Sequence, residues 1–243
     1  KWGVVDDLAQ TGFKLTRGLR LYYPFNETDG SVVQDYSVEM RHAEVIDADL
    51  SVNGKFGSAI DFESIDPFTA RLALYQNELQ INKGAWTMSS WFEAPVPGTG
   101  VTFRHGLAYG EPGYVFLRND FGGPSKILGL FDGTSEKLTS YDASSLSSGW
   151  HHITVSSAVG NTKFFINGNH VGSISDNVIL EVKTVGNLLA GNGKFSPKLD
   201  DFRVYDRTFS TADVTTLYGN GNGDFGVHPY ADFPPSFDNI PVI

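Results

Sequence analysis

Residues 149–174, GWHHITVSSAVGNTKFFINGNHVGSI, indicate the fold more clearly than any other stretch of the chain. Apolar and polar residues alternate on both sides of Asn167 and Gly168, which is the pattern of strands that bury one face. Asn and Gly tolerate the positive φ angles of a two-residue turn, so the stretch predicts a β-hairpin. In one of its two phases, the alternation directs four apolar side chains into a core, namely Ile153, Val155, Phe164 and Ile166.

Short runs of the same kind continue from LRLYYPF, which begins at residue 19, separated by clusters of Gly, Asn, Asp and Ser. Turn residues at 110–113 and 132–134 predict two further hairpins. Many short strands with turns between them favour an all-β fold of two packed antiparallel sheets. The predicted strands span residues 19–25, 43–46, 57–63, 71–75, 86–93, 101–108, 113–118, 126–131, 136–141, 150–157, 162–167, 170–174, 185–190 and 198–205.

One short helix is predicted near the C-terminal end. In DRTFSTADVTTLY, residues 206–218, Ser210 can act as the N-cap and Asp213 as its partner in a capping box. Apolar Val214 and Leu217 follow on one side. The complete expectation is a two-sheet antiparallel β-sandwich with this helix as its one helical element.

The composition limits the function classes open to the chain. Its 243 residues include 28 acidic and 18 basic side chains, giving a formal net charge of −10, so the surface repels nucleic-acid phosphates. No apolar run reaches the roughly 18 residues that a membrane-spanning helix needs, which argues against membrane insertion. The lack of Cys excludes thiolate metal sites and cysteine nucleophiles.

The two ends of the chain differ from the stretch between them. Residues 1–18 carry a weak helical pattern and are predicted to be an N-terminal extension. Residues 223–243 are rich in Gly and then Pro without periodicity, as in a linker or tail. We therefore expect one domain over residues 19–222, joined to neighbouring domains of a larger exported protein whose targeting segment lies outside this sequence.

Five segments, taken in order, carry a resemblance to a known family. They are LYYPFNETDGSVVQDYSVEMRHAEV, GKFGSAIDFE, WTMSSWFEA, GWHHITVSSAVGNTKFFINGNHVGS and KLDDFRVYDRTFSTADVTTLY. Together they resemble the laminin-G-like domains of the concanavalin A-like lectin and glucanase jelly-roll family. The resemblance implies a jelly-roll β-sandwich over residues 19–222. Function must still be argued from the site, because such folds host many activities.

Signatures of catalysis are missing from the sequence. The related sandwich glucanases carry a Glu-x-Asp-x-(x)-Glu strand, whereas EVIDAD, with Glu44, Asp47 and Asp49, has the wrong spacing. DFESID places Asp61 and Glu63 on one predicted strand face but lacks the third carboxylate. We therefore expect a protein that is not an enzyme, and keep a divergent polysaccharide hydrolase or lyase as an alternative.

Acidic residues at the last predicted strand suggest a bound cation. Calcium takes about six to eight oxygen ligands, which loops rich in Asp, Asn and Gly supply. Asp200 and Asp201 open that strand. In the resembling families an Asp at this position holds a structural calcium together with a carbonyl of the opening strand. The resemblance thus implies Asp200 and Pro24 as ligands, with Asp35 as a third candidate; a simple turn-capping role for the aspartates is the alternative.

A ligand site for sugars would need accessible aromatic side chains with polar groups beside them. Along residues 114–120, Tyr114, Arg118 and Asp120 share one face, and Tyr109 lies at the adjoining hairpin. These four residues are the predicted ligand set, although ordinary sandwich packing explains the same alternation.

Taken together, these features favour a non-catalytic carbohydrate-binding or adhesion module, stabilised by calcium and secreted or held at the cell surface. Its expected partner is a glycan or cell-surface polysaccharide. The alternative from another class is a structural or protein-binding spacer that uses calcium only for stability.

Overall fold

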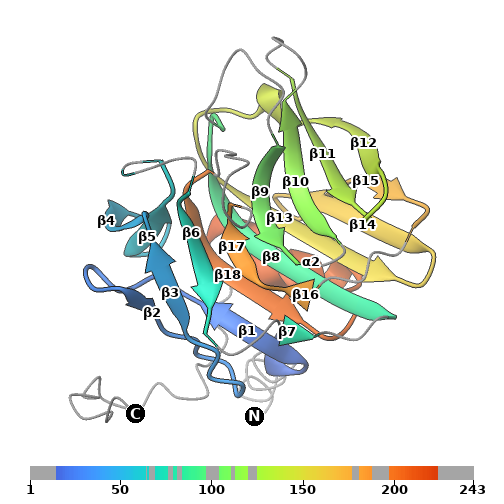
Figure 1. The fold of residues 1–243 in the computed structure, drawn as a ribbon. Coiled ribbons are helices and arrows are strands. Elements are labelled where there is room, and N and C mark those ends of the chain that lie inside the picture. The colour runs from blue at the N-terminus through green and yellow to red at the C-terminus, as the bar shows by residue number, and fades with distance from the viewer. Residues whose placement is uncertain are drawn as a thin grey trace, which may run out of the picture.

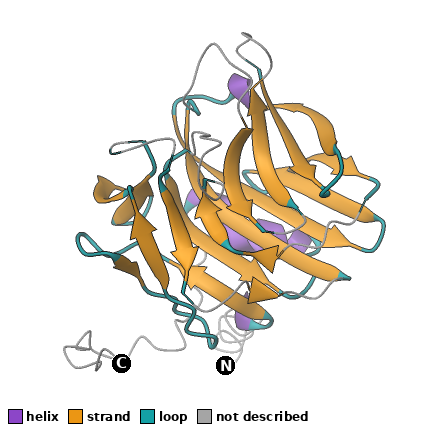
Figure 2. Cartoon of the chain, viewed as in Figure 1, coloured by secondary structure: helices purple, strands orange, loops and turns teal. Residues whose placement is uncertain are grey.

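A computed structural model gives the architecture of most of the chain. It describes residues 15–63, 65, 69–75, 79–80, 84–96, 104–110, 113–119, 125–176, 181–187 and 197–223. In this part of the chain β-strands predominate and the helices are short (Figure 2).

Two antiparallel sheets account for most of the strands in the described ranges (Figure 1). The first sheet has the order β15 (Asn169–Ile174), β14 (Asn161–Ile166), β13 (Gly149–Ala158), β8 (Ala85–Ala94), β18 (Leu199–Tyr205), β5 (Ser58–Asp61) and β4 (Asp49–Asn53), with β1 (Leu19–Tyr23) also paired to β18. The second has the order β12 (Glu136–Asp142), β11 (Lys126–Phe131), β10 (Tyr114–Asn119), β9 (Arg104–Tyr109), β17 (Thr184–Gly186), β6 (Arg71–Leu74), β3 (Ala43–Ile46) and β2 (Val32–Val33). A small additional sheet pairs β16 (Glu181–Val182) with β7 (Leu79–Gln80).

The hairpin that the sequence predicts around Asn167 and Gly168 is confirmed. Both residues have positive φ, 51° and 78°, and they join β14 to β15. The Asn167 side chain also ties this turn to β13, because its Oδ1 accepts the backbone N–H of His152 at 2.9 Å. The turn is therefore fixed both by its own backbone preference and by a contact with the next strand.

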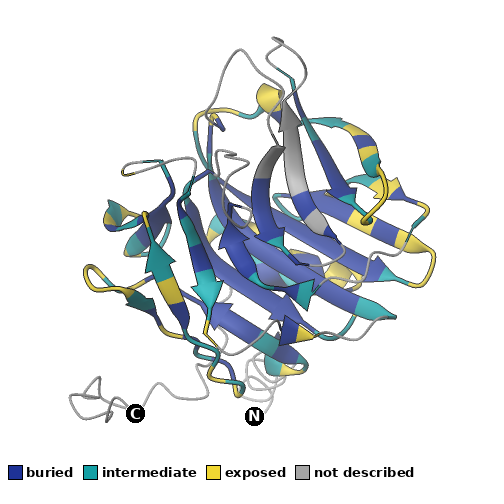
Figure 3. Ribbon diagram, in the orientation of Figure 1, coloured by how far each residue is buried: buried dark blue, intermediate teal, exposed yellow. Residues whose placement is uncertain are grey.

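The main core lies between the two sheets. Ile153, Val155, Phe164 and Ile166 all belong to it and are at most 4% exposed, so the first phase of the alternation is the observed one. Trp86 of β8 joins the same cluster with no exposed surface. Exposed residues gather instead on outlying strands such as β12 and β15 (Figure 3).

A second apolar layer covers the outer face of the first sheet. Helix α2 (Thr211–Tyr218) begins with the predicted capping box, in which Ser210 and Asp213 each bond the other's backbone N–H. Its buried Val214 and Leu217 pack in a cluster with residues of the first sheet and of the segment before β1. The members of this cluster are Leu15, Leu19, Tyr22, Phe165, Tyr205, Phe209, Val214 and Leu217.

The sequence missed four short strands, β2, β4, β7 and β16, each of five residues or fewer. Of the strand predicted over 185–190, residues 185 and 186 belong to β17 (Thr184–Gly186) and Asn187 does not, while residues 188–190 lie outside the described ranges. Leu15, placed in the predicted N-terminal extension, is only 2% exposed and packs in the second apolar layer. Among the described residues, no helix is long and apolar enough to span a membrane.

Candidate cation hollow and ligand face

The edge of β18 changes neighbours within the strand. Leu199 pairs with β5, whereas Phe202 and the residues after it pair with β1. Asp200 and Asp201 lie between these two pairings and have no register partner on either strand in the described structure. This short interval of unpaired edge is where the candidate cation site is found.

A β-bulge on the opposite edge of β18 explains how two consecutive aspartates reach the same place. Relative to β8, the register shifts between Asp200 and Arg203, and Asp201 adopts a φ of 50°. Successive residues of a regular strand point to opposite faces, but a bulge re-aims one of them. Both aspartates therefore line a single hollow.

The hollow has a volume of about 330 Å³. Its walls come from the end of β1 and the residues after it, from the turn before β5, and from β18. The lining residues are Tyr22, Pro24, Asn26, Phe56, Gly57, Asp200 and Asp201. Two of the three predicted metal ligands, Asp200 and Pro24, are thus brought together although they are distant in sequence.

The turn before β5 is shaped to approach Asp200. Gly54 opens this turn, and a Cβ there would lie 2.2 Å from the Ser58 carbonyl oxygen and 2.8 Å from Asp200 Oδ2. Any side chain at Gly54 would push the turn away. The close approach lets the Phe56 N–H donate to Asp200 Oδ2 at 2.8 Å.

Asp200 is the uncompensated charge of the hollow. It is 0% exposed, and its Oδ1 is buried with no hydrogen-bond partner. Burial raises the pKa of its carboxyl to about 7; the Phe56 N–H opposes this effect and the nearby Asp201 charge adds to it. A buried acceptor without a partner is costly, at about 1–3 kcal/mol, so Asp200 Oδ1 marks a place that a cation or a donor would stabilise.

The charge of Asp201 is neutralised by an ion pair with Arg203. Its Oδ1 accepts from Nε and Nη2 of Arg203 at 3.1 and 2.9 Å, and both side chains are buried. The Arg203 guanidinium also lies 4.5 Å from the centre of the Tyr22 ring. One wall of the hollow is therefore a rigid ion pair, and its free negative charge belongs to Asp200.

The donor chemistry of the hollow fits a hard cation. Asp200 Oδ1 is an unpartnered carboxylate oxygen, and the lining residues Pro24 and Asn26 carry carbonyl and amide oxygens. Within the described ranges, no group of three or more His, Cys, Asp or Glu side chains could hold a metal. A cation in this hollow would consequently depend on backbone, amide and water oxygens beside one carboxylate, a mixture that suits calcium.

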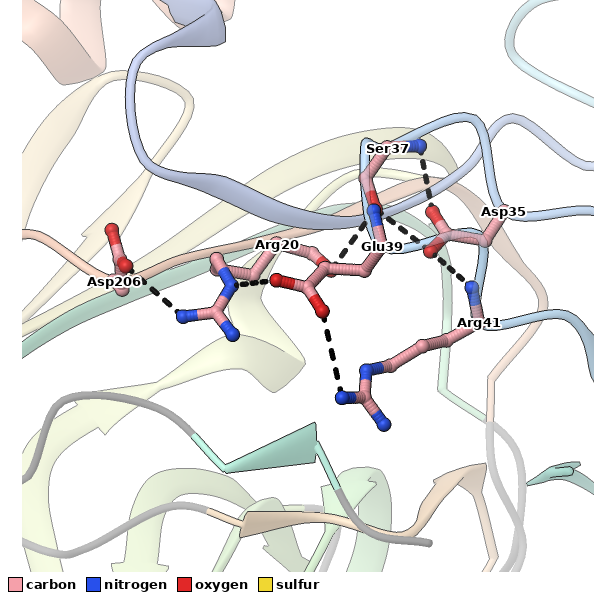
Figure 4. A network of polar contacts seen from close by, with 6 residues as sticks. All are labelled: Arg20, Asp35, Ser37, Glu39, Arg41 and Asp206. Atoms are coloured by element: carbon pink, nitrogen blue, oxygen red, sulfur yellow. Dashed lines mark hydrogen bonds and ion pairs between the residues drawn. The ribbon is translucent and has the colours of Figure 1, made fainter. Parts of the chain in front are cut away.

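Asp35, the third predicted metal ligand, does not line the hollow and has a structural task elsewhere. Its Oδ1 accepts the backbone N–H groups of Tyr22 and Ser37, both at 2.8 Å. Its Oδ2 accepts Ser37 Oγ at 2.7 Å and the backbone N–H of Arg41 at 2.8 Å. Four donors thus use this buried carboxylate to fasten the loop after β2 onto β1 (Figure 4).

The same loop is held by an ionic network on its outer side. Arg20 of β1 contacts Glu39 at 2.7 Å and Asp206 at 3.1 Å, and Arg41 reaches Glu39 at 3.5 Å (Figure 4). These side chains are about one quarter to one third exposed, so each pair adds little by itself. The network orders the loop rather than forming a site.

Two of the predicted ligand residues are brought together on the second sheet. Tyr109 of β9 is the direct register partner of Tyr114 of β10, and Tyr114 is the partner of Phe131 of β11. Val115 belongs to the core, so the alternating positions 114, 116 and 118 of β10 occupy the outer face of this sheet. Tyr109 and Phe131 are half-buried.

We call this region the ligand face and define it by strand positions. It comprises positions 104, 106 and 109 of β9, 114, 116 and 118 of β10, and 127, 129 and 131 of β11. Position 116 is Phe, and its register partners on both sides, Gly106 and Gly129, carry no side chain. Arg118, also predicted, lies in this region, whereas Asp120 falls outside the described residues.

Several residues of the hollow escaped the sequence analysis. Asn26 and Phe56 stand in turns, and Asp201 was expected to cap a turn or open a strand. The glycines of NGKFG, residues 53–57, were the available signal of a turn that approaches another segment closely. Nothing local in the sequence indicates which segment that is.

The carboxylates considered for hydrolysis are arranged for other tasks. Strand β5 ends at Asp61, so Glu63 does not continue it and the prediction that both share one strand face is wrong. Asp61 Oδ1 accepts the backbone N–H of Glu63 at 2.8 Å. Burial, with the neighbouring Asp61 charge as a second cause, raises the pKa of Glu63 to about 7.

Comparison with solved structures shows likeness in fold. The binding domain of botulinum neurotoxin serotype D matches with a TM-score of 0.58 and 15% identity, covering 84% of this chain and 52% of that one. The binding domain of Paraclostridial Mosquitocidal Protein 1 gives 0.57 and 16%, with coverage of 84% and 52%. Trypanosoma rangeli sialidase, in complex with 2,3-difluorosialic acid, gives 0.57 and 14%, with coverage of 85% and 33%.

The chain thus spans about half the length of the two binding domains and a third of the sialidase. No curated protein sequence matches it.

The sequence itself matches a family model of laminin G type, described as the concanavalin A-like lectin/glucanases superfamily, over residues 69–215. This stretch includes the predicted hairpin, most of β18's sheet and the start of α2. It covers more than half of the 243 residues. The chain therefore belongs to the concanavalin A-like lectin/glucanases superfamily.

Proposed function

We propose that this protein is a non-catalytic carbohydrate-binding module whose sugar site is the ligand face. The observation that carries the proposal is the row of aromatic positions Tyr109, Tyr114 and Phe131, which are direct neighbours across three strands. Aromatic rings in a row offer flat apolar surface, and tyrosine adds a hydroxyl that can orient a ligand. Pyranose rings suit such a surface.

Family membership and likeness in fold to ligand-binding proteins support the proposal. The chain belongs to a superfamily that its description names for lectins and glucanases. Two similar structures are a toxin binding domain in complex with SialylT and a sialidase in complex with a sialic acid derivative. Those ligands belong to those proteins, of which this chain matches only part. We further propose a secreted or cell-surface setting beside other domains of a larger protein.

The sugar site can be tested with soluble polysaccharides and matched variants. Affinity electrophoresis and calorimetry on a panel of neutral and acidic polysaccharides should reveal at least one ligand, and Tyr109→Ala or Tyr114→Ala should weaken it about tenfold or more, in line with the roughly 1–3 kcal/mol of a lost stacking contact. Tyr75→Ala is the control, because Tyr75 is 54% exposed and lies beyond the ligand face. Equal binding by all three variants would place the site elsewhere, and a panel without any ligand would refute the proposal.

We also propose that the hollow holds a structural calcium ion. Asp200 would supply a carboxylate oxygen, Pro24 its carbonyl oxygen and Asn26 its side-chain oxygen, with water completing the shell. The support is the fully buried, unpartnered Asp200 Oδ1 beside a segment of unpaired strand edge. The bound ion would join β1, the turn before β5 and β18 at the point where β18 changes neighbours.

Calcium should raise the melting temperature of the chelator-treated protein. At a free concentration one hundred times the dissociation constant, the expected gain in free energy of unfolding is about 2.7 kcal/mol. Asp200→Asn should abolish this gain, whereas Asp176→Asn, which alters a 38% exposed carboxylate near Lys137, should keep it. A calcium gain that survives in Asp200→Asn would exclude the hollow. Calcium stabilisation without any sugar binding would instead favour the spacer function.

A further inference from the structure

The turn between β4 and β5, residues 54–57, contacts the hollow through its backbone. Within this β4–β5 turn, the first N–H donates to the last carbonyl oxygen at 2.9 Å. The Phe56 N–H donates to Asp200 Oδ2 at 2.8 Å, and the backbone of Lys55 bonds the same carboxyl group. The position of the β4–β5 turn is therefore tied to that of Asp200.

The side chains of the β4–β5 turn lie on Trp91 of β8, outside the hollow. The Phe56 ring meets the Trp91 ring edge-on, with centres 5.5 Å apart and 88° between the planes. Lys55 Nζ lies 4.8 Å from the centre of the Trp91 ring. Trp91 is 1% exposed, and the ring of Tyr218, the last residue of α2, lies 5.8 Å from it. Packed rings thus connect the turn with the end of α2.

The segment after α2 packs directly on the Phe56 ring. We call residues 219–223 the terminal turn, because they are the last residues that the structure describes. The Asn222 N–H donates to the Gly219 carbonyl oxygen, and the Gly223 N–H to the last carbonyl oxygen of α2, both at 3.1 Å. Gly223 has a φ of 67°, and a Cβ there would lie 2.8 Å from Phe56 Cζ. Glycine is therefore needed at this position for the close contact with Phe56.

A cation in the hollow would favour the conformation in which the β4–β5 turn is docked. Phe56 bonds Asp200 Oδ2, and a Cβ at Gly57 would lie 3.1 Å from Asn26 Oδ1, so the turn touches both proposed side-chain ligands. Holding these two side chains on one ion also holds the turn that rests on them. In the metal-free protein, hydration of the buried Asp200 Oδ1 instead favours conformations in which the turn has moved away.

We propose that the β4–β5 turn couples cation binding in the hollow to the anchoring of the terminal turn. Calcium would then control how firmly the chain after α2 is held to the sandwich. The inference rests on the proposed calcium site, and extends it to a segment that supplies none of the proposed ligands. If opening of the turn abolishes ion binding, calcium at one hundred times its dissociation constant suppresses that opening by up to about 100-fold.

Hydrogen exchange of the Asn222 and Gly223 amides, followed by NMR on the full chain, measures this coupling. Saturating calcium should slow their exchange about tenfold or more relative to the chelator-treated protein. The reference is the Thr134 N–H, which donates to Asp132 Oδ1 at 2.7 Å in the exposed turn between β11 and β12. Its exchange rate should be the same with and without calcium.

Two variants cut the contact from its two sides. Phe56→Ala removes the ring and keeps the backbone N–H that bonds Asp200. Gly223→Ala adds a Cβ that cannot fit against the Phe56 ring and leaves the hollow unchanged. In both variants calcium should still raise the melting temperature, while the exchange response of the terminal turn should fall below about twofold. Tyr75→Ala, which removes a 54% exposed ring directly after β6, is the control and should keep both responses.

The outcomes separate this inference from the proposed calcium site. If calcium raises the melting temperature but the Asn222 and Gly223 amides respond no more than Thr134, the coupling is refuted while the calcium site stands. The same holds if Gly223→Ala keeps the exchange response of the parent, and this variant decides alone if Phe56→Ala loses its calcium gain. If calcium leaves the melting temperature of the parent unchanged, the calcium site is refuted and the coupling with it.

Discussion

The outer faces of the two sheets differ in how deeply their aromatic residues are buried. The outer face of the first sheet is sealed by α2 and the segment before it, so that Tyr205, Phe209 and Leu217 are at most 2% exposed. The ligand face of the second sheet keeps residues such as Tyr109 and Phe131 half-buried. A sheet needs only one buried face to fold, so the second apolar layer adds stability to the first sheet, whereas Tyr109 and Phe131 on the second sheet keep part of their surface exposed.

Two buried groups with strongly shifted pKa values, His152 and Asp200, lie beside Trp91 in the first sheet. His152 of β13 is 1% exposed, and its ring lies 5.1 Å from that of Trp91 and 6.0 Å from that of Tyr218 on α2. Burial, with the Arg203 charge as a second cause, lowers the pKa of His152 to about 3. Asp200 pairs with Trp91 in the register of β18 and β8, so His152 and Asp200 flank the same residue.

The largest loss of stability should follow from truncating a buried ring in the apolar layer over the first sheet. Phe209→Ala removes a ring that is 2% exposed and lies 4.5 Å from Tyr205 and 4.1 Å from the Arg207 guanidinium. The free energy of unfolding should fall by about 3–5 kcal/mol, as for other buried Phe truncations. Urea denaturation followed by circular dichroism measures it. Tyr109→Ala on the ligand face should cost clearly less, and equal losses would contradict the contrast between the faces.

The next largest effect should appear in the pH dependence of the metal-free protein. The folded-state pKa of Asp200 is raised from 3.8 to about 7, so its contribution to stability is present below pH 3.8 and is lost as pH rises through 7. The pKa of His152 is lowered from 6.5 to about 3, so its contribution is present above pH 6.5 and is lost as pH falls towards 3. Over pH 4–6 the slopes of Asp200 and His152 oppose each other and largely cancel, so the fall in parent stability that remains should come from Glu63, whose pKa is also raised to about 7.

Single variants should expose each slope. Relative to the parent, Asp200→Asn should gain stability as pH rises from about 4 to 7, and should raise metal-free stability at pH 8 by on the order of 2–4 kcal/mol. His152→Gln should leave stability falling from pH 4 to 7. Melting temperatures across this range, in the presence of chelator, measure both. Parallel profiles for the two variants would show that neither group titrates as its burial implies.

A smaller effect is expected at the start of α2. Ser210→Ala removes the Oγ that accepts the Asp213 N–H at 3.2 Å and donates to Asp213 Oδ2 at 2.7 Å. Loss of such an N-cap should lower the free energy of unfolding by about 1 kcal/mol. Thr211→Ala, at the exposed first helical residue, is the control and should change stability by less than half as much. A loss as large as that of Phe209→Ala would mean that α2 depends on its cap rather than on its buried face.

Local patterns in the sequence predicted most of the strands and turns of the sandwich. The Asn167-Gly168 turn and the capping box of Ser210 and Asp213 were predicted correctly, and the inward set beginning with Ile153 is one of the two phases that the alternation allowed. Each depends on residues within one turn or one strand, where backbone preference and side-chain alternation act directly. Strands as short as β2 and β7 lack enough residues for a period, and they were missed.

The site was decided at a longer range. Asp200 was identified from the resemblance, but the bulge at Asp201, the exchange of β5 for β1 along β18, and the approach of the turn at Gly54 arise only when distant strands pair. Asp35 was the third candidate for a metal ligand, but the fold surrounds it with three backbone N–H donors and the Ser37 hydroxyl. The sequence by itself determined most of the segments that form the sheets, and it supplied candidates for the site. Tertiary structure decided which of those residues keep an unused charge, because a carboxylate's partners are fixed by packing rather than by its neighbours in the chain.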